Sequence, residues 1–251
     1  MICYSIGRNR NQGTCRVSVL CMPAAGFTGN NSGIFALLFQ NNHTYGGNKM
    51  NPYENCPIYE NENYLLRLVE LSDAPDLLLV YSDEKAVPFF NSDNCNGDDF
   101  HYTTLERMES AIGFWRRAYE QHAFVRWTVI SKNACHARSS GDNRADGSAG
   151  IAVGTIELFH RQAHDYYHDC GLLRLDLGSG HETLDSILEI LSLIVPTAFD
   201  LFNCGMVATK IPPFAASRIA AAEALGFTAS AEKLVGGDDG KSYGDYYVLL
   251  K

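Results

Sequence analysis

The sequence predicts a layered fold of the α/β or α+β class, in which helices cover a β-sheet. From residue 50 onward, segments with strand character alternate with segments whose apolar residues keep helical spacing, and this alternation is typical of layered folds. Of the 251 residues, 46% are hydrophobic and 20% are charged. That composition describes a soluble globular protein large enough for one ample core or two small ones.

Residues 1–49 differ from the rest of the chain. They are rich in Asn, Gly and Ser and lack a sustained hydrophobic period. We expect either a flexible extension or a segment outside the native domain, with the authentic start at Met50 in the second case. The domain itself is then expected over residues 50–251. A short apolar run after Arg16 imitates a signal peptide only loosely and has no convincing cleavage site, so we expect a cytoplasmic protein.

The first part of the domain shows a strand followed by two helices. Residues 64–69 are predicted to form a strand, and Ser72 is placed to cap a helix that runs through residue 81. A second helix is expected to begin at the capping box that Thr103 and Glu106 form. It should end near Gln121.

The second part of the domain supplies most of the predicted sheet. Strands are expected at residues 124–130, 150–159, 171–177, 206–211 and 246–250, and the polar stretch 131–148 suits a long hairpin loop. After Gly178, an apolar stripe with helical spacing extends to Phe202, and Pro196 should kink or interrupt that helix. A last helix is predicted at residues 214–225 and stops at Gly226.

Charge and cysteine content exclude several classes of partner. The formal net charge of −9 and the lack of a basic cluster argue against nucleic acid, because nucleic-acid binders neutralise phosphates with clustered Lys and Arg. No apolar run approaches the roughly 20 residues that a membrane span needs. The eight cysteines include no C-x-x-C pair, so they are interpreted as reduced thiols.

Four segments carry a resemblance to a known family. They are YLLRLVELSDAPDLLLVYSDE, AVGTIELF, SRIAAAEALGF and YGDYYVLL, in this order along the chain. Their order and spacing resemble the GNAT superfamily, especially the branch that acetylates ribosomal-protein N-termini and small amines. The resemblance implies an α+β fold with a mixed, twisted sheet flanked by helices. It also implies an N-acetyltransferase that uses acetyl-CoA as cosubstrate and a primary amine as acceptor.

The resemblance also implies a cofactor site. In the family, the strands that correspond to residues 171–177 and 206–211 splay apart and expose backbone groups that pair with pantetheine. The pyrophosphate sits on the next helix start, where unpaired N–H groups and the positive dipole end favour anions. The candidate residues are Leu175, Leu177, Gly178, Ser179, Gly180 and His181. The family's R-x-x-G-x-G/A motif and its cation are missing here, and Ser179 with Glu182 also fits a simple capping box.

Candidate catalytic residues are a base and an acid. An amine must lose a proton to attack the thioester, and Glu157 is the first candidate base, with Asp176 second. The alternative for each is a solvated strand charge. The family usually has Asn and Ser near the start of its last helix, where Ala215 and Arg218 stand here, and often a Tyr that protonates the thiolate. Tyr243 is a conceivable substitute for that acid.

A histidine triplet raises a different hypothesis. His160, His164 and His168 are spaced four apart, so on a helix their imidazoles would share one face and could bind a metal. The segment connects two strands, however, and has no apolar stripe that would hold a helix in place. We therefore expect exposed loop histidines and no metal site.

Two functional classes remain open from the sequence. The first is an acetyl-CoA-dependent N-acetyltransferase, and the second is a GNAT-fold binding or regulatory module that has lost acetyl-CoA chemistry. The acidic surface favours a cationic acceptor for the enzyme. Since many members of the family are dimers, a homodimer is also expected.

Overall fold

The computed structural model describes residues 51–133, 150–237 and 239–251. The expected extension over residues 1–49 lies outside the described residues, as does most of the expected loop 131–148. None of the helices in the described residues has the length and apolar character needed to cross a bilayer.

An eight-stranded mixed sheet forms the centre of the molecule, in the order β1-β2-β3-β4-β5-β6-β10-β7. Among the described strands, β5 and β6 alone pair in parallel, and every other neighbouring pair is antiparallel. The strands are β1 (Tyr59–Glu60), β2 (Tyr64–Leu68), β3 (Val125–Ser131), β4 (Ile151–Arg161), β5 (Cys170–Leu177), β6 (Met206–Lys210), β7 (Thr228–Ala229) and β10 (Tyr246–Leu250). A separate two-stranded sheet joins β8 (Leu234–Val235) and β9 (Ser242–Tyr243). The predicted α+β class with a mixed sheet is therefore confirmed.

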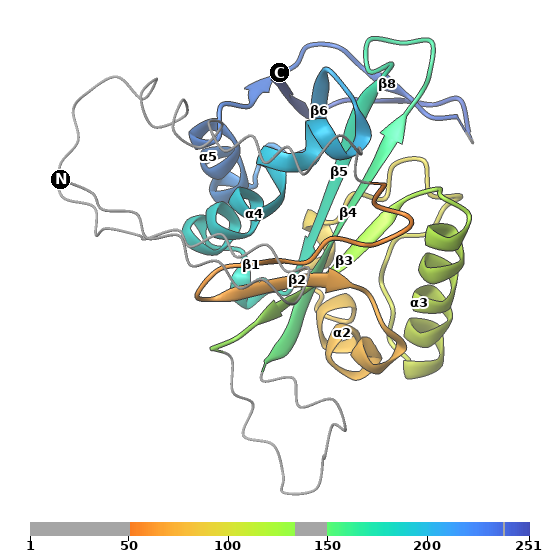
Figure 1. Ribbon diagram of the computed structural model, residues 1–251, viewed down its shortest axis with the longest axis vertical. Coiled ribbons are helices and arrows are strands. Elements are labelled where there is room, and N and C mark those ends of the chain that lie inside the picture. The colour runs from red at the N-terminus through yellow and green to blue at the C-terminus, as the bar shows by residue number, and fades with distance from the viewer. Residues whose placement is uncertain (1–50, 134–149, 238) are drawn as a thin grey trace, which may run out of the picture.

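Helices cover both faces of the sheet (Figure 1). They are α2 (Ala74–Tyr81), α3 (Leu105–Glu120), α4 (Leu184–Phe202) and α5 (Ala216–Ala224). On one face, α2 packs on β4 and α3 packs on β3, whereas α4 and α5 pack together on the opposite face. Short 3₁₀ turns lie at η1 (Leu71–Asp73), η2 (Val87–Phe89) and η3 (Ser179–His181).

Two helix starts differ from the prediction. The expected cap at Ser72 is wrong, because Glu70 and Asp73 form a capping box on η1 and α2 follows it directly. For α3, the N-cap is Thr104 and not Thr103, since its hydroxyl accepts from the Arg107 N–H at 3.2 Å. In this Thr-Thr pair, residue 104 has the extended backbone of a cap, so its neighbour does not take that role.

Helix α4 runs without interruption through Pro196. Its inward face is buried throughout, as residues such as Ile187, Ile194 and Ala198 show. This packing holds the helix together although proline removes one backbone hydrogen bond. Thr183 caps α4 by accepting from the Ser186 N–H, and Ser179 lies inside η3, so the alternative of a capping box formed by Ser179 and Glu182 is wrong.

The two faces of β4 differ in chemistry. Ile156 and Leu158 belong to the apolar core that α4 completes, whereas Glu157 points to the opposite face, as the two-residue period of a strand requires. A side chain at Gly154 would bring its Cβ within 2.2 Å of the Asp176 carbonyl oxygen. Glycine at this position therefore lets β4 and β5 approach each other closely.

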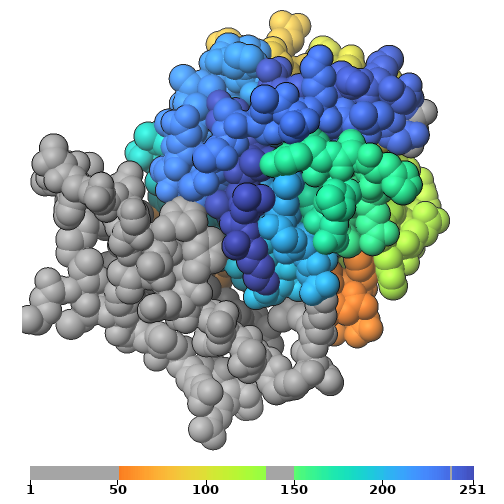
Figure 2. Space-filling model, turned by 90° about the horizontal axis from the view of Figure 1, so that it is seen from above, coloured from red at the N-terminus to blue at the C-terminus, as the bar shows by residue number. Residues whose placement is uncertain are grey.

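The C-terminal segment after α5 folds back over the connection between β4 and β5. Figure 2 shows these C-terminal residues in blue beside the green residues of that connection. The Arg161 guanidinium donates to the Val235 carbonyl at 2.8 Å, and the Tyr167 hydroxyl donates to the Glu232 carbonyl at 2.9 Å. These bonds fix β8 and β9 next to the sheet.

Candidate active site

The hydrogen-bonded pairing between strands β5 and β6 ends halfway along β5. Their parallel pairing runs from Cys170 opposite Met206 to Leu173 opposite Thr209 and then ends. Beyond that point β5 continues to Leu177 with β4 as its partner, and β6 continues to Lys210 with β10 as its partner. The parallel pairing therefore ends in the region where the resemblance implied a splay. The backbone of residues 174–177 has lost its β6 partner.

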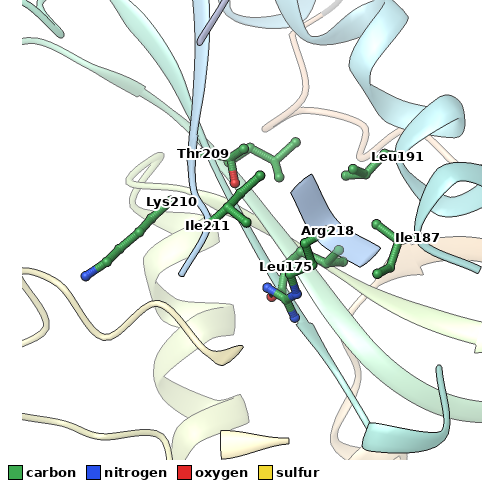
Figure 3. Close-up of a pocket in the computed structure, with 8 residues that line it drawn as sticks. Leu175, Ile187, Leu191, Thr209, Lys210, Ile211 and Arg218 are labelled. Atoms are coloured by element: carbon green, nitrogen blue, oxygen red, sulfur yellow. Dashed lines mark hydrogen bonds between the residues drawn. The ribbon is translucent and has the colours of Figure 1, made fainter. Parts of the chain in front are cut away.

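The space between the parted strands is almost filled. A cavity of only about 10 Å³ remains there, lined by Leu173, Leu175, Ile187, Leu191, Thr209, Lys210, Ile211 and Arg218. Figure 3 shows Arg218 beside Leu175, while the Lys210 side chain points away from both. A volume of this size holds at most a single water molecule.

The Arg218 side chain occupies the opening between β5 and β6, and all three of its guanidinium nitrogens donate hydrogen bonds. Its Nη1 donates to the Leu175 carbonyl at 2.8 Å and to the Phe89 carbonyl at 3.0 Å. Nε donates to Glu182 at 2.9 Å, and Nη2 bonds the second oxygen of the same carboxylate. Arg218 is 4% exposed, so this ion pair is buried. The candidate cofactor residue Leu175 therefore already uses its carbonyl oxygen within the chain.

The turn after β5 also uses its backbone donors internally. Four N–H groups donate within the chain: Gly178 to the Val153 carbonyl, Ser179 to the Asp83 carboxylate, His181 to the Gly178 carbonyl and Glu182 to the Ser179 carbonyl. Although partial burial acts to raise the pKa of Asp83, the Ser179 side chain and the backbone N–H donors around the carboxylate lower that pKa. A phosphate group at this turn would have to displace the Asp83 carboxylate.

A second and far larger cavity opens on the α2 and α3 face of the sheet. Its volume is about 900 Å³, and its walls come from residues 94–102, from α3 and from the neighbouring strands β3, β4 and β5. The segment 94–102 carries three non-glycine residues with positive φ: Asn94 at 57°, Asn96 at 52° and Phe100 at 56°. Such values are strained for a bulky residue such as Phe100, and strain of this kind clusters at functional sites.

Paired charges form the floor of the large cavity. Glu157 accepts from Arg126 Nε at 3.1 Å through one oxygen and from Arg174 Nη1 at 2.9 Å through the other. Arg126 also donates to Asp176 at 3.1 Å, and its guanidinium lies 4.2 Å from the centre of the Trp115 ring. Arg126 and Glu157 are each 1% exposed, so this network is closed off from bulk water.

The arginines set the protonation state of Glu157. Burial acts to raise the pKa of this carboxyl, but the positive charges of Arg126 and Arg174 outweigh burial and lower it below 4.5. Glu157 therefore contributes stability that is present above its ordinary pKa and lost as pH falls through the lowered one. At neutral pH the residue is a carboxylate. Its low pKa makes it a weak proton acceptor.

Asp176 is buried beside this network and does not line either cavity. One of its oxygens accepts from the Tyr81 hydroxyl at 2.8 Å and from Arg126, whereas Oδ1 has no hydrogen-bond partner. Burial, followed by the Asp176 charge, raises the pKa of Tyr81 well above 10. Tyr81 therefore stays protonated and donates to Asp176.

Tyr243 lies on β9, outside the walls of both cavities. Its hydroxyl donates to Asp239 at 2.5 Å, and this hydrogen bond raises the pKa of the phenol. Lys210 Nζ lies 5.7 Å from the centre of the Tyr243 ring and bonds Asp93 at 2.7 Å. The candidate acid therefore sits beside the end of β6, held by an exposed turn.

The histidine triplet does not form one face of a helix. His160 is in β4, whereas His164 and His168 are in the turn that follows it. The His160 Nε2 atom contacts Asp169 at 2.6 Å. Across the part of the chain that the structure describes, no three His, Cys, Asp or Glu side chains gather as metal ligands would.

Several residues of the site escape prediction from the sequence. Arg126 and Arg174 neutralise the proposed base, and Asp93 bonds Lys210 from a loop more than 100 positions away along the chain. Arg218 is notable in the sequence only as a departure from the family pattern. A signal that could have identified Arg126 and Arg174 is their position within otherwise apolar strands, where an isolated charge requires a partner.

Comparisons with solved structures give a consistent result. A putative ribosomal-protein-serine acetyltransferase from Vibrio cholerae aligns with a TM-score of 0.55 at 12% identity, covering 80% of this chain and 100% of its own. A GNAT-family acetyltransferase from Bacillus anthracis has a TM-score of 0.51 at 14% identity, covering 77% and 98%. RimL, a ribosomal α-N-protein acetyltransferase in complex with coenzyme A, has a TM-score of 0.52 at 12% identity, covering 77% and 97%.

Searches of protein-family models and of curated proteins found no match to this sequence. The structural likeness therefore rests on architecture: the mixed sheet, the parting of its one parallel pair and the helices on both faces. On this basis, the chain has the fold of the GNAT acetyltransferases.

Proposed function

We propose that the protein is an acetyl-CoA-dependent N-acetyltransferase that acts on a primary amine. The observation that carries this proposal is the end of the β5–β6 pairing after Leu173 and Thr209. A cavity of about 900 Å³ lies on the α2 and α3 face of the same sheet and includes Arg174 of β5 in its walls. The parted strands offer a place for pantetheine, and the cavity offers a place for the acceptor. The coenzyme A complex of RimL, which shares this fold, supports the choice of cofactor.

The residues proposed for the cofactor are those of β5 and the turn after it. Leu175 and Leu177 would bond the pantetheine amides through their backbone, and residues 178–181 would face the pyrophosphate. Glycine at 178 and 180 lets a phosphate approach the backbone closely. A built-in obstacle remains, because Arg218 and Asp83 now occupy part of this region.

In the proposed reaction the roles of the carboxylates differ. Glu157 lines the acceptor cavity and is ionised at neutral pH, with both of its oxygens bonded to Arg126 and Arg174. It assists deprotonation only weakly, because its pKa lies far below that of an amine. Asp176 accepts a hydrogen bond from Arg126 and is the second candidate base. Tyr243 is the proposed acid that protonates the departing thiolate.

This assignment predicts an unusual dependence of turnover on pH. The value of kcat/KM should rise with the deprotonation of the substrate amine itself, because Glu157 is already ionised over the accessible range. For a peptide α-amine the rise should level off near pH 8, and for an alkyl amine near about pH 10. The measurement is the release of CoA thiol from saturating acetyl-CoA across a pH series, with both classes of acceptor.

The variant Glu157→Gln completes this test. It should lower kcat/KM by less than about 100-fold and leave each inflection at the same pH, because the residue is paired with two arginines and is not the main base. An inflection near pH 6 or 7 that stays fixed when the acceptor changes would assign the proton to an enzyme group instead. If no amine is acetylated by the folded protein, the enzyme proposal fails.

A second candidate function follows from the fact that side chains nearly fill the opening between β5 and β6. A GNAT-fold binding or regulatory module without acetyl-CoA chemistry is favoured by the buried pair of Arg218 and Glu182, which fills the place of the pantetheine. Under this alternative the large cavity binds its ligand without acetylating it. Ligand binding to the cavity with no acetyl transfer at millimolar acetyl-CoA would support the module.

A further inference from the structure

Arg218 stands where a cofactor chain would have to pass. Its Nη1 donates to the Leu175 carbonyl at 2.8 Å, and that oxygen lies on the part of β5 that has no β6 partner. The same nitrogen donates to the Phe89 carbonyl at 3.0 Å. One side chain of α5 therefore bonds both β5 and η2, beside the cavity that remains between β5 and β6.

Glu182 fixes the guanidinium in this position. The carboxylate binds Arg218 through both oxygens, and both side chains are at most 7% exposed. Phe89 covers the pair from outside, with its ring centre 5.5 Å from the guanidinium carbon, and Phe214 packs edge-on against Phe89. A buried pair of this kind is held firmly, since separating the charges would leave each one without compensation.

We propose that the Arg218–Glu182 pair is a plug that competes with the pantetheine chain of acetyl-CoA for the β5 edge. The cofactor must displace the guanidinium to reach the Leu175 carbonyl, so the plug lowers the affinity of the protein for acetyl-CoA. The role differs from that of a phosphate-binding arginine, because here the cation opposes binding. This inference rests on the proposed function, since it takes acetyl-CoA as the competing ligand.

The test is calorimetric titration of the full-length protein with acetyl-CoA. Arg218→Ser removes the plug and frees both carbonyl oxygens, so the Kd for acetyl-CoA should fall by about tenfold or more, which is the scale of one lost charged hydrogen bond. The double variant Arg218→Ser with Glu182→Gln should bind acetyl-CoA at least as tightly as the single variant, and therefore more tightly than wild type. It leaves no buried charge unpaired, so it serves if the single variant does not fold.

A matched control is Arg161→Ala. Arg161 also binds a carboxylate through both guanidinium ends, at Asp165, and it donates to two backbone carbonyls, but it lies beside β8 away from the opening. This variant should leave the Kd unchanged. A general loosening of the fold would instead lower the Kd in the control as well, and that result overturns the plug.

The remaining outcomes separate the two proposals. If wild type binds acetyl-CoA and the folded double variant binds equally or more weakly, the plug is refuted and the cofactor site stands. If neither binds, the cofactor site and the plug both fail. If only the variants bind, the plug is supported and wild type is held closed by it.

Discussion

Replacing Arg126 by Met is expected to lower the free energy of unfolding by about 3–5 kcal/mol, which is the usual cost of breaking a buried ion pair by removing one partner. The substitution takes one cation away from Glu157 and, among the residues that the structure describes, the only ion-pair partner away from Asp176. It also removes the guanidinium that stacks on Trp115. Urea denaturation followed by circular dichroism measures the change.

Two comparisons isolate the buried charge as the cause. Arg116→Met on the exposed side of α3 makes the same chemical change and should shift stability by less than about 0.5 kcal/mol. Adding Asp176→Asn to Arg126→Met should recover part of the loss, because the carboxylate left without its arginine is then gone, whereas Glu157 keeps Arg174. If Arg126→Met cost no more than Arg116→Met, the network under the cavity would not be a stabilising element.

Introducing Trp at Ser110 is expected to reduce kcat/KM for the amine by about 100-fold or more, equivalent to about 2.7 kcal/mol of transition-state binding. Ser110 is an exposed residue on the α3 wall of the large cavity, so an indole there occupies acceptor space without entering the core. The Kd for acetyl-CoA should stay the same, because Ser110 does not line the opening between β5 and β6. Steady-state kinetics and calorimetry give the two values.

Glu109→Trp is the matched control for this prediction. Glu109 is the adjacent exposed residue of α3 and does not line the cavity. It should leave both kcat/KM and the Kd near their wild-type values. Equal losses in the two variants would show that bulk on α3 disturbs the protein in general, and the large cavity would then no longer be the acceptor site.

The architecture could be predicted because each main element carries its own local signal. The alternation of β4 around Glu157 and the apolar stripe of α4 give strand and helix periods directly. Boundaries were less accurate: Thr104 caps α3 although Thr103 has the same side chain, and backbone conformation decides between them. Pro196 is tolerated because packing along α4 outweighs one missing hydrogen bond.

The candidate site was less predictable than the fold. Glu157 was predicted as a base from its position in β4, but its low pKa depends on Arg126 and Arg174, which come from two other strands. No local pattern reports such a pairing. The role proposed for Arg218 likewise depends on its hydrogen bond to the Leu175 carbonyl. These residues are more than 40 positions apart, and only the three-dimensional arrangement brings them within hydrogen-bond distance.

The central claim, that acetyl-CoA binds where β5 and β6 part, is tested most directly by amide hydrogen exchange of the full-length protein. With millimolar acetyl-CoA, we expect slower exchange at residues 174–181 and at the start of α5, with no change in β1 and β2. Unchanged exchange throughout the folded protein, or slower exchange confined to segments outside this opening, would contradict it.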